Sequence, residues 1–158
     1  MVKLIPMDPA EFDGYLEEST TGYAEDQVKN GNWDQKTALE KARAEYMNLL
    51  PDGVQTKDHH LLSIVDETSG KIGVMWFGVR QDGKRRRGYI YDFLIDEAHR
   101  GRGFGKQALA ALDDILDEMQ VDFIELHVFA HNLNARGLYR KMGYEETNLY
   151  MRKTFRRK

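Results

Sequence analysis

Residues 91 to 106 read Tyr91-Asp92-Phe93-Leu94-Ile95-Asp96-Glu97-Ala98-His99-Arg100-Gly101-Arg102-Gly103-Phe104-Gly105-Lys106, and this stretch decides the fold of the 158-residue chain. A run of β-branched and aromatic residues stops at Ile95, three glycines follow, and a helical pattern begins at Phe104, which predicts strand, loop and helix. Glycines allow positive φ, so their N–H groups can converge, and the helix start adds free donors. With Arg100, Arg102 and Lys106 beside these donors, the loop is suited to a phosphate or pyrophosphate.

The spacing of this loop narrows the choice of motif. It lacks the Gly-Lys-Ser/Thr ending of a P-loop, and its glycines do not follow G-x-G-x-x-G. It fits Arg-x-x-Gly-x-Gly at Arg100, Gly103 and Gly105. That loose pattern alone is equally compatible with a flexible turn, so a second motif must decide between the two interpretations.

The second motif lies in residues 126–144. It follows Asn-x-x-Ala-x-x-Leu-Tyr-x-x-x-Gly-Phe/Tyr, with matches at Asn132, Ala135, Leu138, Tyr139, Gly143 and Tyr144. With both motifs in this order, the chain resembles the GNAT superfamily of acyl-CoA-dependent N-acetyltransferases. The resemblance covers residues 60–154, whereas the first 57 residues match only in a general way.

The resemblance implies an α/β fold of the mixed α+β kind, with a mostly antiparallel sheet flanked by helices. Its fourth and fifth strands run parallel, as a right-handed crossover also requires, and splay apart to admit the pantetheine arm of acetyl-CoA. Acetyl-CoA is therefore the implied co-substrate. The implied binding residues are Phe93, Leu94, Ile95, Arg100, Gly101, Arg102, Gly103, Phe104, Gly105, Lys106 and Asn132.

Local patterns place the other elements in one domain over residues 1–158. Asp8 precedes a helical pair over residues 8–50, whose second helix we expect Asp34 to cap, and this pair forms one wall of the acceptor site. The core over residues 60–154 holds the cofactor site. We predict strands at 2–5, 60–65, 71–79, 88–95 and 121–129, a helix from 104, a short helix capped by Asn132 or Asn134, and one or two strands over 144–155.

Composition excludes several classes of protein. The chain has no cysteine, which removes disulfides, thiolate metal sites and a thiol nucleophile, and suits a reducing cytoplasm. A net charge of -3 gives no general attraction to nucleic acid or membrane. His59, His60 and His131 lack ligand spacing to a carboxylate cluster, so we expect no metal site. A homodimer is possible by family analogy.

Catalytic roles follow from the resemblance residue by residue. Tyr139 matches the tyrosine that protonates the coenzyme A thiolate, and an N–H near Leu94 or Ile95 would polarise the thioester carbonyl. Two residues compete as general base. Asp92 on the fourth strand would need a raised pKa or a bridging water, whereas His127 on the fifth strand is of a residue type suited to proton transfer at neutral pH but could equally be a packed histidine.

These features predict an enzyme that transfers an acetyl group from acetyl-CoA directly to a primary amine of a small molecule or peptide. The alternative is a GNAT-like module that binds acyl-CoA as a sensor and turns over nothing. Tyr15, Tyr23 and Trp33 are the aromatic residues expected beside the acceptor. If the basic run 84–87 faces this opening, it favours an acceptor with an anionic portion over a polycation.

Overall fold

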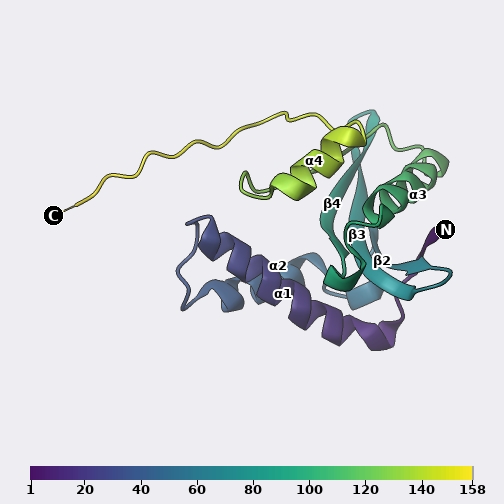
Figure 1. The fold of residues 1–158 in the computed structure, drawn as a ribbon, viewed down its shortest axis with the longest axis horizontal. Helices are drawn as coiled ribbons and strands as arrows, with labels where there is room; N and C mark the ends of the chain where they lie inside the picture. The colour runs from purple at the N-terminus through teal and green to yellow at the C-terminus, as the bar shows by residue number, and fades with distance from the viewer. Residues whose placement is uncertain (158) are drawn as a thin grey trace.

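Five strands form one sheet in the order in which they occur in the chain (Figure 1). The computed structural model describes residues 1–157. Neighbours from the first to the fourth strand pair antiparallel, whereas the fifth runs parallel to the fourth. The predicted mixed sheet is thereby confirmed. The strands are β1 (Val2–Pro6), β2 (His59–Asp66), β3 (Gly70–Asp82), β4 (Arg85–Ile95) and β5 (Phe123–Leu126).

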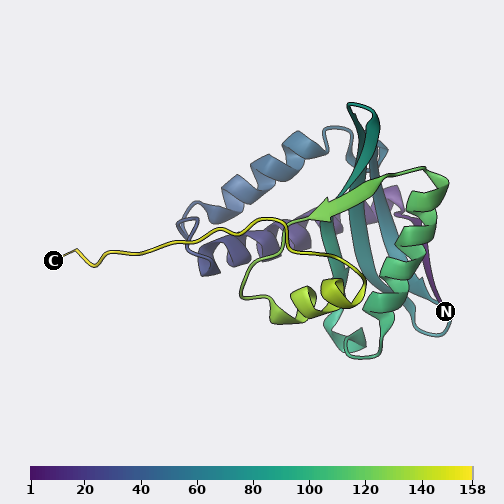
Figure 2. The same cartoon turned by 90° about the horizontal axis from the view of Figure 1, so that it is seen from above.

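Helices cover both faces of the sheet and give three layers (Figure 2). One face carries α1 (Phe12–Lys29) and α2 (Ala38–Leu49), and the other carries α3 (Phe104–Glu118) and α4 (Leu133–Lys141). Across residues 1–157, no helix is both long enough and apolar enough to span a membrane. Short 3-10 turns occur at Pro9–Glu11, Gly53–Gln55 and Glu97–His99.

The two faces carry separate cores, because side chains alternate between faces along each strand. Ile64, Met75 and Phe77 are completely buried on the side of α3. Trp76 points the other way, where its ring centroid lies 5.3 Å from that of Tyr46 on α2. The second core is rich in aromatic side chains.

A β-bulge interrupts β4 at Tyr91. Trp76 of β3 pairs with Asp92 and Phe77 pairs with Ile90, which leaves Tyr91 as the extra residue. A bulge sets two successive side chains on one face. Tyr91 accordingly stacks on Trp76 at 4.6 Å, and Asp92, on the same face, contacts α1. Alternation alone would send Asp92 to the opposite face, where α3 lies.

The predicted splay of β4 and β5 is present. Their pairing runs from Arg87 and Phe123 to Ile90 and Leu126 and then stops, although β4 continues to Ile95. The prediction of a strand over 121–129 is wrong in length, because β5 contains only Phe123–Leu126. At its start, the N–H of Val121 bonds instead to the last turn of α3, at Leu116 O. Residues 91–95 of β4 therefore lie beyond the end of their pairing with β5.

The prediction that Asp34 caps the second helix is wrong. α2 begins at Ala38, and Asp34 Oδ1 accepts instead from the N–H of Lys36. Aspartate can close a local turn as readily as a helix, because both use the N–H two residues on. Asp8 caps the 3-10 turn Pro9–Glu11, because its carboxylate accepts from the N–H of Ala10, and α1 itself begins only at Phe12.

The prediction of one or two strands over residues 144–155 is also wrong. Residues 145–157, here called the C-terminal arm, form neither helix nor strand and leave the body of the protein (Figures 1 and 2). Arg152 donates to the carbonyl oxygens of Asn30 and Gly31, at 2.9 and 3.2 Å, and so holds the arm against the end of α1. The period-2 pattern indicates a strand but does not specify which edge it pairs with.

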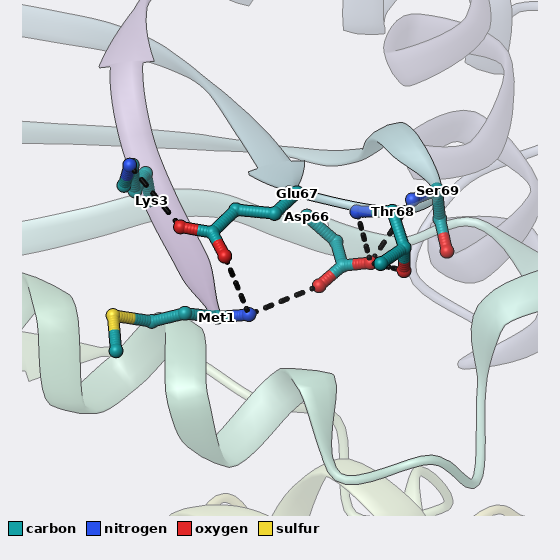
Figure 3. A network of polar contacts seen from close by, with 6 residues as sticks. All are labelled: Met1, Lys3, Asp66, Glu67, Thr68 and Ser69. Carbon is teal, nitrogen blue, oxygen red and sulfur yellow. Dashed lines mark hydrogen bonds and ion pairs between the residues drawn. The ribbon is translucent and has the colours of Figure 1, made fainter.

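The first residue of the chain joins the turn between β2 and β3 in a polar network (Figure 3). Asp66 accepts from the Thr68 hydroxyl at 2.6 Å and from the N–H groups of Thr68 and Ser69 at 3.2 and 3.0 Å. The Met1 ammonium lies 3.4 Å from its other oxygen. These bonds, that of the Thr68 hydroxyl first, hold the pKa of Asp66 well below its usual range. The network thus ties β1 to the turn between β2 and β3.

Candidate active site

The glycine loop runs directly into the first turn of α3. Gly101 and Gly103 have φ of +74° and +80°, values that side-chain-bearing residues rarely adopt, and Gly103 is the N-cap of the helix. A Cβ built on either one meets no atom within 4 Å. An unobstructed stretch of backbone therefore lies at the N-terminus of a 15-residue helix, beside its free N–H groups. Phosphate groups bind proteins at sites of this kind.

Gly105 has a different role from the other two glycines. A Cβ at this position would lie 3.0 Å from Cδ2 of Leu138 and 3.9 Å from Cζ of Phe93. Its lack of a side chain lets the start of α3, the middle of α4 and the end of β4 meet closely. Gly105 is therefore a packing residue that joins the phosphate loop to Tyr139, the next residue on α4.

The three basic residues of the loop are not equivalent. Arg100 Nε donates to the carbonyl of Ile95 at 2.8 Å, so it ties the loop to the end of β4. The Arg102 guanidinium lies over the ring of Phe104 at 4.9 Å. Lys106 is exposed one turn into α3 and forms no ion pair within the described chain. Arg102 and Lys106 are therefore the cations available to an anion.

The side chain of Asp92 lies between β4 and α1, where it is hydrogen-bonded to two side chains of α1. Its Oδ2 accepts two hydrogen bonds of 2.9 Å, one from the Tyr15 hydroxyl and one from the Ser19 hydroxyl. Burial raises the pKa of Asp92 above its ordinary value, and these two bonds only partly oppose the rise. Burial, and the nearby Asp92 charge after it, in turn raises the pKa of Tyr15. Asp92 thus has the raised pKa that a carboxylate base requires.

Tyr139 is half-buried on α4 beside the end of β4. Its ring lies 6.4 Å from that of Phe93 and 5.3 Å from that of Tyr144. Burial, followed by the charges of Tyr144 and Asp92, raises the pKa of Tyr139. The hydroxyl therefore stays protonated at neutral pH.

His127 is exposed just beyond the end of β5, in edge-to-face contact with Phe129 at 4.9 Å. It lines a groove of about 980 Å³ that also contains Tyr139. The sequence-based candidates thus form two groups, because Tyr139 and His127 line this groove whereas Asp92 contacts α1. His127 makes no hydrogen bond to a carboxylate within the described residues, so nothing there orients its ring as a base.

Asn132 is the N-cap of α4, because its Oδ1 accepts from the N–H of Ala135 at 3.2 Å. This decides between the two candidates for the cap, Asn132 and Asn134. At the same corner, His131 Nε2 lies 3.8 Å from the Asp26 carboxylate at the end of α1. Asn132 therefore orders the loop beside the gap between the strands.

Two polar residues beside the site escaped the sequence analysis. Tyr89 lies two positions before the bulge, with its ring 4.8 Å from that of Tyr91. Glu125 of β5 forms an ion pair with Arg87 across the parallel strands. Only the register of β4 with β5 brings these residues together, so no local motif could have found them.

The basic run 84–87 is partly engaged by β5. Arg87 is paired with Glu125, and the Arg85 guanidinium lies 4.2 Å from the ring centroid of Phe123. The N–H of Arg86 bonds to Asp122. These contacts hold the hairpin tip to the start of β5. Within residues 1–157, no three potential metal ligands gather in one place.

Comparison with known proteins agrees with this geometry. The profile of the Acetyltransferase (GNAT) family matches residues 25–144, which is most of the chain. The chain belongs to the GNAT acetyltransferase family. It is 40% identical over 152 residues to the uncharacterized N-acetyltransferase YycN of Bacillus subtilis, covering 96% of this chain and 97% of that protein. The crystal structure of YycN superposes with a TM-score of 0.95 at 38% identity, over 99% of this chain and 100% of YycN.

A more distant GNAT relative has a named substrate. The spermine/spermidine N(1)-acetyltransferase of Bacillus subtilis is 36% identical over 66 residues, which is 41% of this chain and 43% of that enzyme. The identity covers less than half of either chain. This GNAT protein therefore shares its fold with YycN over nearly its whole length, whereas its likeness to the spermine/spermidine enzyme is confined to 66 residues.

Proposed function

We propose that this GNAT protein transfers an acetyl group from acetyl-CoA directly to a primary amine of a small molecule or a peptide. The observation that carries the proposal is the pocket of Asp92. A carboxylate held by two hydroxyl groups, with a raised pKa, lies where β4 separates from β5. A protein that only binds acyl-CoA has no use for such a base.

The residues at the start of α3 fit the pyrophosphate of coenzyme A. Gly101 and Gly103 leave the backbone open, and Arg102 and Lys106 supply positive charge. The pantetheine arm would lie along Phe93, Leu94 and Ile95, where β4 is no longer paired with β5. Acetyl-CoA supplies an activated acyl group in a thioester, and we assign Asp92 as the base and Tyr139 as the proton donor that would act on it.

The chemistry assigned to the side chains is the movement of two protons. The amine nitrogen bonds to the thioester carbonyl carbon as the carbon–sulfur bond breaks. Asp92 accepts the proton that the amine loses, directly or through one water. The Tyr139 hydroxyl donates a proton to the departing sulfur, and its raised pKa keeps it protonated until then. His127 remains the second candidate for the base.

The acceptor would enter from the side of α1. Tyr15, which donates to Asp92, and Tyr91 pack on that side, and aromatic faces together with a carboxylate attract an ammonium group. The relative named as a spermine/spermidine N(1)-acetyltransferase supports the inclusion of polyamines among the acceptors tested.

The test is release of coenzyme A from acetyl-CoA in the presence of a panel of polyamines, amino sugars, amino acid derivatives and lysine peptides. We expect amine-dependent release, with the acetylated amine identified by mass spectrometry. Calorimetric binding of acetyl-CoA without release for any amine would favour the sensor alternative. Absence of binding would reject both.

A further inference from the structure

The two oxygen atoms of the Asp92 carboxylate have different surroundings. Oδ2 accepts from the Tyr15 hydroxyl and from the Ser19 hydroxyl, each at 2.9 Å. Within residues 1–157, Oδ1 accepts from no side chain, and it is not one of the enclosed polar atoms that lack a partner. Each carboxylate oxygen has about two lone pairs. Those of Oδ2 are therefore occupied, whereas Oδ1 is free of side-chain donors and accessible.

Both donors come from one face of α1. Tyr15 and Ser19 are four residues apart, so their side chains lie one above the other on the helix. The Tyr15 ring is 6% exposed and packs in the same core as Tyr46 and Trp76. Because this packing fixes the position of the Tyr15 hydroxyl, the carboxylate orients toward the hydroxyl.

We propose that Tyr15 and Ser19 are positioning residues, which hold the Asp92 carboxylate so that Oδ1 is the oxygen that accepts the proton of the amine. This role rests on the proposed function. As the amine nitrogen bonds to the thioester carbon, an N–H bond breaks and its electron pair stays on nitrogen. The proton goes to Oδ1, directly or through one water, while Tyr139 protonates the departing sulfur. Oδ2 becomes the carbonyl oxygen of a neutral acid, which still accepts both hydrogen bonds.

The same two hydrogen bonds oppose the effect of burial on Asp92. Burial raises the pKa of Asp92, whereas the bonds from Tyr15 and Ser19 and the N–H of Phe93 lower it. Hydrogen bonds to a charged acceptor are stronger than those to a neutral one. Removal of either hydroxyl should therefore raise the pKa of Asp92 further, so that less of the carboxylate is ionised at a given pH.

The neighbours of Asp92 do not obscure this effect. The titratable groups whose pKa the Asp92 charge raises are Tyr15 on α1, Tyr46 on α2 and Tyr139 on α4. Burial is the first cause of each rise, so all three hydroxyls remain neutral around neutral pH. In the described part of the chain, no charged side chain shifts the pKa of Asp92. A changed titration of Asp92 can therefore be assigned to the lost hydroxyl.

Carbon-13 NMR of the full chain, labelled at the aspartate carboxyl carbons, measures this titration without any substrate. The Asp92 resonance is assigned by its absence from Asp92→Asn. We expect its titration midpoint to move to higher pH in Tyr15→Phe and in Ser19→Ala. If circular dichroism shows that Tyr15→Phe does not fold, the partly exposed Ser19→Ala decides.

Two matched controls should titrate as the wild type does. Tyr46→Phe controls for Tyr15→Phe, because Tyr46 is also 6% exposed in the same core but donates to no carboxylate within the described residues. Thr21→Ala controls for Ser19→Ala, because its hydroxyl bonds back to the helix, at the carbonyl of Glu17.

Kinetics with an amine from the panel adds a second measurement. The acid limb of kcat/KM should move to higher pH in Tyr15→Phe and Ser19→Ala, with a loss of at least ~threefold in acid and a smaller loss in base. The KM for acetyl-CoA should stay nearly constant. Ser19→Thr keeps a hydroxyl and should restore the wild-type profile. Combined with Asp92→Asn, neither substitution should lower kcat further, because the base is already absent.

An unchanged titration midpoint in both variants would overturn the inference whatever the activity. Losses of kcat that are equal at every pH, or that add to the loss in Asp92→Asn, would also overturn it. An unchanged kcat in Asp92→Asn would remove the base and its positioning residues together but leave acetyl transfer in place. A shifted midpoint in a protein that acetylates no amine would reject the proposed function, although the two hydroxyls would still hold Asp92.

Discussion

Asp92→Asn should separate catalysis from stability in this protein. Both donors to the carboxylate, the Tyr15 and Ser19 hydroxyls, converge on Oδ2 at 2.9 Å. An asparagine whose amide oxygen occupies that position keeps both hydrogen bonds and loses only the charge and the basic lone pair. The variant is therefore a nearly isosteric removal of the proposed base.

The expected loss of kcat is ~10² to 10⁴, the usual contribution of a general base, with the KM for acetyl-CoA nearly unchanged. Stability should move the other way. Because burial raises the pKa of Asp92, the folded protein favours the neutral form of this side chain. The charged carboxylate therefore lowers the free energy of unfolding at neutral pH. We expect the free energy of unfolding to rise by up to about 1 kcal/mol, which corresponds to a Tm increase of about 2–4 °C.

The pH dependence of the Tm difference between Asp92→Asn and wild type provides a second check. The stability linked to a carboxyl group with a raised folded pKa is fully present below its unfolded pKa and is lost as pH rises through the folded pKa. The Tm advantage of Asp92→Asn should therefore be absent in acid and appear as pH rises. Asp96→Asn, an exposed aspartate just after β4, is the matched control. A kcat within about threefold of wild type with chemistry rate-limiting, or a lower Tm at neutral pH, would refute the reasoning.

Three further predictions concern other parts of the molecule. Tyr139→Phe should lower kcat by ~10² to 10⁴ in steady-state assays while the KM for acetyl-CoA changes little, and a larger effect on KM would contradict the acid role. Gly103→Val should weaken acetyl-CoA binding by calorimetry at least ~10-fold, because its side chain enters the space at the helix start; Gly83→Val, with a comparable φ of +62° in a distant turn, controls for backbone strain and should bind normally. Asp66→Asn should lower the urea midpoint at neutral pH, and the difference should vanish as pH falls through the depressed folded pKa of Asp66; an equal loss at every pH would show that charge is not involved.

Local chemistry explains which parts of the site could be predicted from the sequence. Gly101 and Gly103 adopt positive φ, and Asn132 caps α4, because each depends on residues within three or four positions. The parallel course of β4 and β5 followed from chirality, which holds for any strand, helix and strand in one sheet. These elements required no knowledge of distant contacts.

The parts that failed depend on pairing across long distances. The length of β5 is set by where its register with β4 ends. The strand prediction for residues 144–155 failed because a period-2 pattern does not specify which sheet edge a segment pairs with. The contacts of Asp92 join residues that are 77 and 73 positions apart in the chain. No window of sequence contains both partners.

The bulge at Tyr91 connects these observations to function. In a regular strand, Asp92 would face the apolar core under α3, where a carboxylate would have no donors and would be strongly disfavoured. The extra residue turns Asp92 toward α1 and thereby turns Phe93 and Ile95 toward the α3 side. One irregular position thus lets a single strand present a base on one face and keep its packing on the other. Sequence patterns assume regular strands, so they fail at the residue where the fold departs from regularity to hold the proposed base.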